Sequence, residues 1–408
     1  MQKTTIIGMI IHRKNLIGDY RVKEENRSNH IKTISKIIVI VFLVFVIVMV
    51  SARYLTDEDF RSYIDTNILK KEVSETTLNA IEIDSETNPT IYSYDKYITI
   101  LSKNKLKEYT ANGKVEVELD VNVAVPLIAS NGKYMVIAEK DGQKIYLISG
   151  TNILWNGEIE GNISNINVNK NGYISVVIKN TTYKSVVAFF DLTGKELFRT
   201  YLSTSYVVCT DISPNNKYLA IGEVDYSGTV IKSNVKIISV DDAQKDPENC
   251  IVYTYESDNG EIITNMNYQN KDFVICMFND YIQKVTTQSN ERLYENKDKD
   301  LFIDINLNDT IAIIDKQSSG LFSYEYEVIV KNTNNKSESL YILNSDLPKT
   351  MSTSGNNIAL NLGNEVQIIN TSGWLLKKYI SSKQIKGIVV GDTIVGIIYK
   401  NRIEIISL

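Results

Sequence analysis

The stretch ISPNNKYLAIG at residues 212–222 decides the fold, because its pattern occurs eight times along the chain. Each copy has a short strand, then a turn of Asn, Gly, Asp or Lys, then a bulky residue that opens an apolar strand. The bulky residues recur about every 40 residues, which is the signature of a repeat architecture. The other copies read YSYDKYITIL (92–101), IASNGKYMVIA (128–138), VNKNGYISVVI (168–178), YQNKDFVICMF (268–278), LNDTIAIID (307–315), TSGNNIALNL (353–362) and VVGDTIVGII (389–398).

This period fits four short antiparallel strands per copy, which is one blade of a β-propeller. In the third copy, the pattern predicts strands over 163–168, 173–179, 185–191 and 196–202, with Gly194 in the last turn. That turn needs Gly because one of its positions has positive φ. The sequence therefore predicts an all-β fold with an eight-bladed β-propeller. Seven blades is the alternative, because irregular copies can be miscounted.

The eighth copy has no fourth strand of its own, since the sequence stops at Leu408 after a third strand. Residues 78–83, LNAIEI, alternate with period two and lie just before the first copy. We expect them to pair with residues 402–407 and close the ring. Closure removes the unpaired strand edges that an open array would expose. The predicted propeller domain thus spans 78–408.

An uncharged apolar run precedes the repeats. Residues 37–52 read IIVIVFLVFVIVMVSA and lie between Lys36 and Arg53. Extended to 33–52, the segment makes about 30 Å of helix, enough to cross the hydrocarbon core of a bilayer if Lys36 snorkels. We expect a transmembrane helix over 33–52 with the lipid bilayer as its partner. It acts as an uncleaved signal anchor, with a cleaved signal peptide as the alternative.

Charge on either side of this helix predicts its orientation. Residues 1–36 carry eight Lys or Arg and three acids, a net charge of +5, so the remainder carries −5 − 5 = −10. The positive-inside rule keeps a basic tail, residues 1–32, in the cytoplasm and exports the C-terminal domain across the plasma membrane. A short juxtamembrane helix and a linker are expected over 53–77, with Thr56 as the helix cap. The acidic exported part predicts no nucleic-acid partner.

Two segments carry a resemblance to known propellers. AFFDLTGKELF at 188–198 and DISPNNKYLAIGE at 211–223 are similar to blades of YVTN/WD40-like bacterial proteins. With the start SYDKYITILSKNKL at 93–106, the basic tail and the single anchor, the whole chain resembles a family of membrane-anchored β-propellers of unknown function from Gram-positive bacteria. The resemblance implies the fold and a place at the cell envelope, and it brings no activity or ligand. The Trp-Asp ends and Gly-His pairs of true WD40 blades are missing, so that family's partners are not transferred.

Much chemistry is excluded by residue usage. Both histidines, His12 and His30, precede the apolar run, so the predicted propeller has none for Ser-His-Asp or Cys-His catalysis or for His-ligated metals. No P-loop or dinucleotide fingerprint is present. Trp155 and Trp374 are the two tryptophans, whereas quinone-cofactor propellers stack several on the cofactor. We therefore expect no cofactor, no metal site and no catalytic constellation.

Two carboxylates are the weak site candidates. Asp211 and Asp304 each lie seven residues before a bulky residue, on predicted innermost strands near the central channel. Such acids can bind Ca²⁺ or act as an acid–base pair. Their copies are not adjacent, however, so we expect a separation above ~10 Å and bonds to neighbouring backbone or solvent. Cys209 and Cys250 fall on first and fourth strands, about 14 Å apart, which is too far for a disulfide.

These observations favour a binding or scaffold module at the cell envelope, and an enzyme is less favoured. The expected partner is an unknown protein or a cell-wall polymer. The alternative is a carboxylate-dependent glycan hydrolase or lyase, which requires two converging acids.

Overall fold

The computed structural model describes most of the chain. It covers residues 36, 38–57, 60, 61, 64, 68, 78–179, 182–258, 260–296, 302–318, 324–343 and 347–408. The chain divides into two units, Met1–Leu69 and Lys70–Leu408, and each is described by itself.

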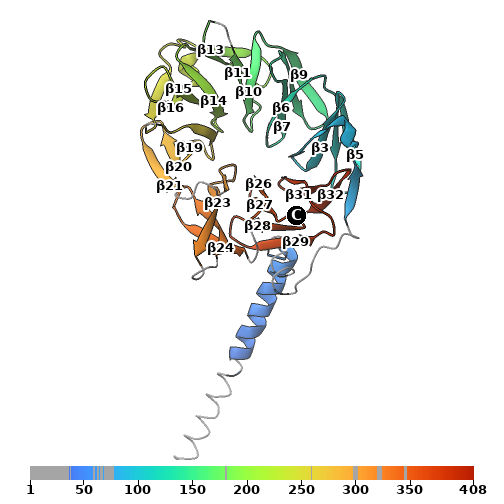
Figure 1. Ribbon diagram of the computed structural model, residues 1–408. Helices are drawn as coiled ribbons and strands as arrows, with labels where there is room; N and C mark the ends of the chain where they lie inside the picture. The colour runs from blue at the N-terminus through green and yellow to red at the C-terminus, as the bar shows by residue number, and fades with distance from the viewer. Residues whose placement is uncertain are drawn as a thin grey trace, which may run out of the picture. The chain divides into compact units, whose positions relative to one another are not determined.

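The second unit is an eight-bladed β-propeller, as predicted: eight four-stranded sheets are arranged in a ring (Figure 1). The innermost strands of blades 1 to 8 are β2 (Thr90–Tyr94), β6 (Pro126–Asn131), β10 (Asn162–Val168), β14 (Ser205–Ile212), β18 (Ile263–Asn267), β22 (Ile303–Asp304), β26 (Thr350–Ser354) and β30 (Gly387–Val390). The second strands are β3 (Tyr97–Ser102), β7 (Tyr134–Glu139), β11 (Ile174–Lys179), β15 (Tyr218–Asp225), β19 (Phe273–Phe278), β23 (Thr310–Ser318), β27 (Asn357–Asn361) and β31 (Ile394–Ile398).

The outer half of each blade follows in the same order. The third strands are β4 (Lys105–Tyr109), β8 (Lys144–Ser149), β12 (Ser185–Phe190), β16 (Lys232–Ser239), β20 (Tyr281–Thr286), β24 (Tyr324–Asn332), β28 (Glu365–Asn370) and β32 (Arg402–Ser407). The outermost strands are β5 (Val115–Asp120), β9 (Asn152–Glu158), β13 (Glu196–Leu202), β17 (Ile251–Glu256), β21 (Asn290–Glu295), β25 (Glu338–Leu343), β29 (Leu375–Ile380) and β1 (Asn79–Glu82). All neighbouring strands within a blade run antiparallel.

The first strand of the domain completes the last blade. β1 pairs with β32 in antiparallel register, with Ala80 opposite Glu404 and Ile81 opposite Ile403. The backbone N–H of Ile83 extends the contact, donating to Asn401 at 2.9 Å. Because β1 and β32 lie at opposite ends of the domain sequence, their pairing joins the two ends of the ring.

Both faces of a blade are buried against its neighbours. Along β12, Val186 and Ala188 belong to a cluster shared with blade 2, and Val187 and Phe189 belong to a cluster shared with blade 4. Successive side chains of a strand point to opposite faces, so this strand contributes to two interfaces. The continuous apolar run of β12 follows from that double burial.

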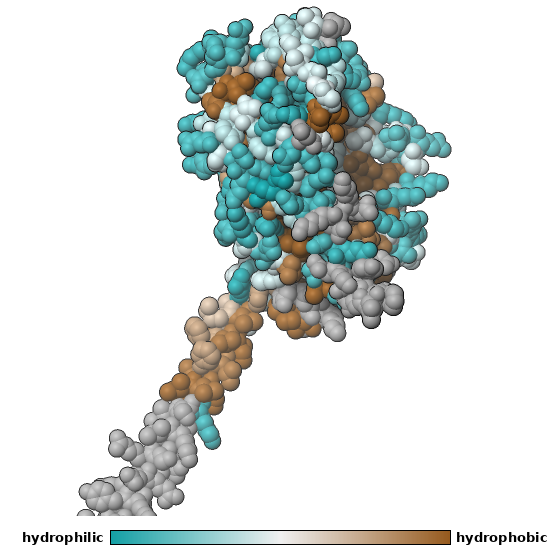
Figure 2. Space-filling view, turned by 60° about the vertical axis from the view of Figure 1, so that its left-hand side comes forward, coloured by the Kyte–Doolittle hydropathy of each residue, from teal (hydrophilic) through white to brown (hydrophobic). Residues whose placement is uncertain are grey.

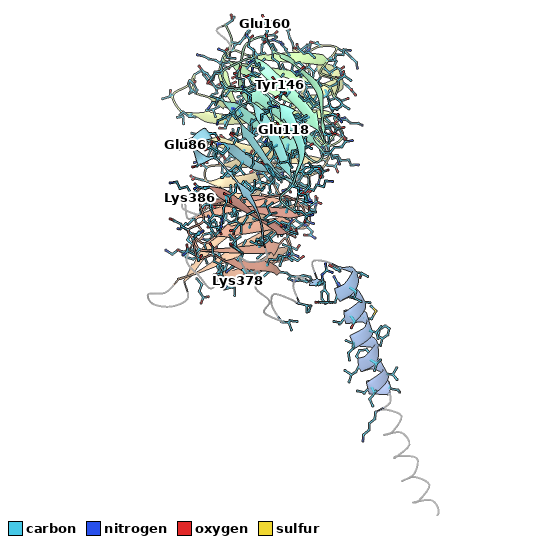
Figure 3. All side chains as sticks on the ribbon, turned by 90° about the vertical axis from the view of Figure 1, so that its right-hand side faces the viewer. Glu86, Glu118, Tyr146, Glu160, Lys378 and Lys386 are labelled. Carbon is cyan, nitrogen blue, oxygen red and sulfur yellow. The ribbon has the colours of Figure 1, made fainter. Side chains whose placement is uncertain are left out.

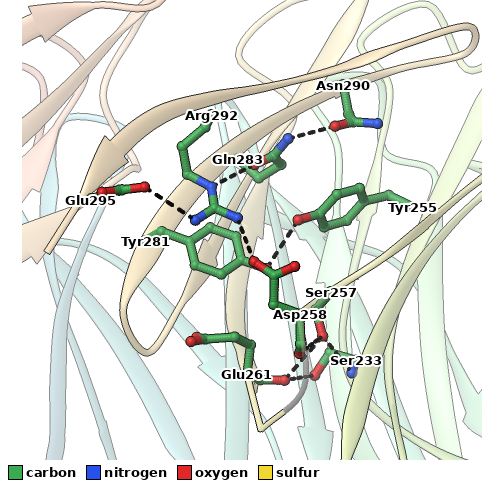
Figure 4. A network of polar contacts seen from close by, with 10 residues as sticks. All are labelled: Ser233, Tyr255, Ser257, Asp258, Glu261, Tyr281, Gln283, Asn290, Arg292 and Glu295. Atoms are coloured by element: carbon green, nitrogen blue, oxygen red, sulfur yellow. Dashed lines mark hydrogen bonds and ion pairs between the residues drawn. The ribbon is translucent and has the colours of Figure 1, made fainter.

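Polar groups also join neighbouring blades, most visibly blades 4 and 5 (Figure 4). The hydroxyls of Tyr255 and Tyr281 lie 3.0 Å apart. Arg292 places its guanidinium 3.5 Å from the centre of the Tyr281 ring and 3.2 Å from a carboxylate oxygen of Asp258. Residues on two sheets are thereby held through one arginine.

The turn between β12 and β13 requires glycine at position 194. The φ of Gly194 is +82°, a conformation that L side chains rarely adopt, and an added Cβ would lie 2.7 Å from the Trp155 ring of blade 2. Asp191 shapes the same turn by accepting from the N–H groups of Thr193 at 2.8 Å and Lys195 at 3.1 Å. The turn between the third and fourth strands thus also packs on the neighbouring blade.

Blade 4 contains a helical insertion. A short helix, α3 (Val240–Ala243), follows β16 and is capped by Ser239, whose hydroxyl accepts from the N–H of Asp242 at 3.4 Å. Another short turn, η3 (Ser85–Thr87), links β1 to β2. Cys250 follows the insertion and is, like Cys209 and Cys276, a buried free thiol.

The first unit contains the helix Ile38–Thr56, which has a mean hydropathy of 2.7 and none of its apolar window buried. It continues beyond the predicted end at residue 52, and the Thr56 hydroxyl donates to the Ala52 carbonyl at 2.9 Å inside it. The predicted cap at Thr56 is therefore wrong by one residue, since Asp57 accepts from the Phe60 N–H at 2.9 Å. The predicted tail 1–32 and most of the segment 53–77 lie outside the described residues.

Ring closure can be tested at Ile81, which is 3% exposed and packs in the interface of blades 8 and 1. Truncating a buried Ile costs about 2–4 kcal/mol, so we expect Ile81→Ala to lower the free energy of unfolding by that amount. Urea denaturation of the full-length protein in lipid nanodiscs measures it. The control is Ala80→Ser on the exposed side of β1, which should change stability by about 0.5 kcal/mol or less. Equal stability of the two variants would contradict closure by β1.

Candidate ligand site at the channel mouth

A cavity of about 610 Å³ lies where the innermost strands run into their second strands. Every blade contributes to its wall, which places it at one mouth of the central channel. We call it the channel mouth. Its polar lining consists of Ser93, Ser130, Asn131, Asn167, Asn169, Asn265, Asn267, Gln269, Asn306, Asn308, Thr353, Ser354, Asp95, Lys170, Asp211 and Asp392.

Neutral amides and hydroxyls dominate this lining. Their origin is the repeated turn pattern, because the Asn-rich turns follow the innermost strands in most blades. Amides offer both donors and acceptors, and they carry no charge that would select an ion. With only Asp95, Lys170, Asp211 and Asp392 as charged members of the lining, most of the mouth is suited to hydrogen bonds with neutral polar groups of a ligand.

Several of the amides join one blade to the next. Asn169 donates to the Ser213 carbonyl at 3.1 Å, and Asn267 donates to the Ile305 carbonyl at 2.7 Å. Asn357, which lies outside the lining, donates from its side-chain amide to the carbonyl of the lining residue Asp392 at 2.9 Å. Each bond runs from one blade to a backbone group of the following blade. The wall of the mouth is thus fixed by the contacts that hold the ring together.

Asp211 lies in this wall, as its sequence position predicts for an innermost strand. It is 5% exposed and accepts from the Ile212 N–H at 2.9 Å and, with its other oxygen, from the Tyr268 N–H of blade 5. Burial raises the pKa of Asp211 to about 7, against these bonds and one from Asn167. Both oxygens are thereby engaged in holding blades 4 and 5 together.

Asp304 is placed differently. It lies on β22 and is half-buried, but it is not among the residues that line the mouth. One of its oxygens accepts from the Asn306 N–H at 2.7 Å, and burial raises its pKa. The two predicted acids belong to blades 4 and 6, and blade 5 separates them.

One acceptor in the mouth is unused. The Oδ1 atom of Asn167 is buried and has no hydrogen-bond partner within the described residues. Leaving a buried polar atom unpaired costs about 1–3 kcal/mol. A donor on a bound ligand or a water molecule would recover that energy. Within the same described part of the chain, no three His, Cys, Asp or Glu residues are grouped to hold a metal ion.

Sequence reasoning missed Glu108, the most unusual carboxylate in the propeller. The Glu108 side chain is fully buried between blades 1 and 2, and neither of its carboxylate oxygens has a hydrogen-bond partner among the described residues. Burial, helped by the charges of Asp95 and Glu116, raises the pKa of Glu108 to about 7. The signal was present in KLKEY at 105–109, where period two places Glu108 on the same face as the core residue Leu106.

The fold and the mouth define a closed β-propeller with a polar axial cavity. Residues 69–408 match a family of unknown function, DUF5711, and the chain belongs to that family. No curated protein matches the chain.

Solved structures show the same fold at low identity. The C-terminal WD40 domain of Sif2 is 12% identical with a TM-score of 0.52, covering 81% of this chain and 98% of that one. Sqt1 from Chaetomium thermophilum is 11% identical with a TM-score of 0.49, covering 81% and 99%. BamB from Moraxella catarrhalis is 11% identical with a TM-score of 0.45, covering 83% and 99%. Such distant similarity concerns the fold alone.

The unpaired carboxylate predicts a pH-dependent stability. Since the folded pKa of Glu108 lies above its ordinary 4.5, the folded state holds this proton more tightly, and stability falls as pH rises from about 4.5 to about 7. We expect Glu108→Gln to match the wild type near pH 4 and to exceed its unfolding free energy by roughly 2 kcal/mol near pH 8. Denaturant titrations across this range measure the difference.

The matched control is Glu160→Gln, at an exposed carboxylate on the edge of the propeller (Figure 3). The unfolding free energy of this variant should change with pH in the same way as that of the wild type. A slope that Glu108→Gln leaves unchanged would show that Glu108 finds a partner or solvent in its charged form.

Proposed function

We propose that the protein is a membrane-tethered, extracytoplasmic binding module, and that the channel mouth holds a segment of a cell-wall polymer or of a protein. The single observation that carries this proposal is the mouth itself: all eight blades contribute to a cavity of about 610 Å³, and most of its polar side chains are neutral amides and hydroxyls. An amide-rich wall recognises hydroxyl and peptide groups, because both donate and accept hydrogen bonds without charge.

Rigid walls support binding. Ordering loops at an interface consumes binding free energy, and a preformed site avoids that cost. In the mouth, Asn169, Asn267 and Asp211 are fixed by bonds to the next blade. A ligand therefore meets groups that are already in place.

Hydrolysis of a glycan is less well supported. Such enzymes need two carboxyl groups about 5–10 Å apart, one of them free to exchange a proton with substrate. Asp211 uses both oxygens for the N–H groups of Ile212 and Tyr268, and Asp304 lies outside the lining. The two predicted acids thus serve the fold and do not form such a pair, which favours a binder; the lining also holds the carboxylates of Asp95 and Asp392.

Membrane tethering rests on the helix Ile38–Thr56, whose length and composition suit one crossing. The basic residues that precede it favour a cytoplasmic N-terminus and an exported propeller. The family resemblance to anchored propellers agrees with this topology.

Topology can be tested by labelling engineered cysteines in intact cells with a membrane-impermeant maleimide. Lys386→Cys lies on the propeller surface (Figure 3), and Lys14→Cys lies in the tail. We expect the first to react and the second to react only after permeabilisation. The native thiols at 209, 250 and 276 are buried, so background should be low. Labelling of Lys14→Cys alone in intact cells would overturn the proposed orientation.

Ligand binding at the mouth can be tested with a photoreactive residue at Asn306, an exposed lining position. Irradiation of producing cells should give a discrete adduct, because the residue faces the bound segment. The control position is Asn122, which is exposed on the loop between β5 and β6, away from the mouth. Absence of any adduct at Asn306, or an identical pattern at Asn122, would contradict a ligand at the mouth.

A further inference from the structure

Exposed aromatic residues of the propeller gather in one place. Of the tyrosines in the described part of the chain, three are exposed: Tyr201 by 53%, Tyr206 by 38% and Tyr226 by 49%. They lie at the end of β13, at the start of β14 and just after β15, where β15 is paired with β14. Their position is remote from the mouth, since Tyr206 precedes Asp211 by five residues of one strand, or about 16 Å.

The tyrosines are arranged in two ring pairs. Tyr206 and Tyr226 stack with centroids 5.1 Å apart and planes 10° from parallel. The ring centroids of Tyr201 and Tyr183 lie 4.8 Å apart. Lys184, which follows Tyr183 in the sequence, places its ammonium 5.4 Å from the centre of the Tyr206 ring. We call these five residues the tyrosine cluster. Tyrosine and its close packing are typical of the centre of protein interfaces, where large rigid rings lose little entropy on binding.

A groove of about 500 Å³ is lined by residues of blades 3 and 4, and Tyr183 and Tyr201 of the tyrosine cluster are among them. One wall is the continuous run Arg199–Ser205, and the opposite wall includes Lys236, Ile238 and Ile251. Successive residues of a strand point to opposite faces, so a cavity lined by four consecutive residues of β13 must follow the edge of that strand. β13 is the outermost strand of its sheet, and this edge has no neighbouring strand.

Both cations that line the groove are paired within the protein. Arg199 makes two bonds to Glu196, at 2.8 and 2.9 Å, and Lys236 lies 2.7 Å from the nearly buried Glu223. The hydroxyl of Thr200, in contrast, is buried in the groove without a partner among the described residues. Glu248 also lines the groove, and its carboxylate has no ion pair among the described residues. The groove therefore offers hydrogen bonds, apolar contacts and one carboxylate, and its two cations are paired.

We infer that an extended, uncharged polypeptide segment of a partner protein docks along β13. The segment adds a strand to blade 3 and places apolar side chains at the tyrosine cluster. An extended backbone can pair with a whole row of donors and acceptors along a strand edge, as in strand addition. The side chains then meet the rings of Tyr201 and Tyr206 and the exposed aliphatic surface of Ile251, which is 45% exposed.

Other ligands fit these features less well. An anionic polymer would need several free cations. Arg199 and Lys236 are paired, which leaves Lys184 near the groove, and the lining also carries the carboxylate of Glu248. A sugar could stack on tyrosine, but it has no use for a strand edge. Hydrophobic residues form small separate patches on the side of the propeller seen in Figure 2, which suits recognition of a short segment better than a broad flat interface.

The test uses full-length protein in lipid nanodiscs and a displayed library of random linear peptides as the probe. We expect enrichment of peptides with apolar side chains and few charges. Their affinity, measured by fluorescence anisotropy, should fall about tenfold or more in Tyr201→Ser and in Tyr206→Ser, because interface tyrosines carry much of the binding energy. Hydrogen exchange should slow at the β13 amides when the selected peptide binds.

Matched controls are Leu340→Ser and Ile342→Ser on β25, the outermost strand of blade 6, where both side chains are at least half exposed. They should bind the peptide like the wild type, and Asn306→Leu at the channel mouth should as well, so this inference and the proposed function can fail separately. No enrichment over empty nanodiscs would overturn the inference. So would peptide binding unaffected by the tyrosine variants, or tyrosine-dependent binding of purified wall glycan in its place.

Discussion

The structure depends on burying both faces of every sheet. A single blade has apolar side chains on each side, as Phe189 and Phe190 on β12 show by packing in different clusters. Such a sheet is stable only between two neighbours, and a row of them ends in two exposed faces unless it closes. The last blade is completed by the pairing of β1 with β32. The stability of each blade therefore depends on the closure of the whole ring.

The same constraint explains the chemistry of the channel mouth. Innermost strands converge there, and their turns must satisfy backbone groups of the adjacent blade as well as their own. Asn169 and Asn267 do this with side-chain amides, and Asp211 does it with a carboxylate. A surface built to join blades is consequently a surface of amides. The proposed binding role uses groups whose first task is structural.

Much of the fold could be predicted from sequence, because a propeller repeats its local signals. Turn residues and a bulky residue at about 40-residue intervals define the blades without any knowledge of their contacts. In blade 3 the predicted strand 173–179 differs from β11 by one residue. The expected helix cap failed at Thr56 because the helix ran on to include it, and a cap at Asp57 satisfies the next turn equally well.

The site was less predictable, because its contacts join residues that lie far apart in the sequence. Period and position placed Asp211 on an innermost strand, but they could not show that its partner is the Tyr268 N–H, 57 residues away. Asp304 has the same spacing in sequence but a different register. It lies opposite Ala312, one residue after Ile311, whereas Asp211 lies opposite Ala220, two residues after Tyr218, and Asp304 is not among the lining residues. The tyrosine cluster brings together four strand ends from two blades, and no pattern within one repeat predicts that they lie side by side.

The most direct test of the central claim is a disulfide across the closing strands. Glu82 and Arg402 are paired neighbours in the β1–β32 register, and the native cysteines are buried. Opposite residues of an antiparallel pair lie within the Cα separation that a disulfide requires. The account predicts that a protein with Glu82→Cys and Arg402→Cys forms an intramolecular crosslink on mild oxidation, seen as a shift in gel mobility that reductant reverses. Failure to crosslink in the folded protein, while Glu82→Cys pairs instead with a cysteine on another blade, would contradict the closed eight-bladed ring.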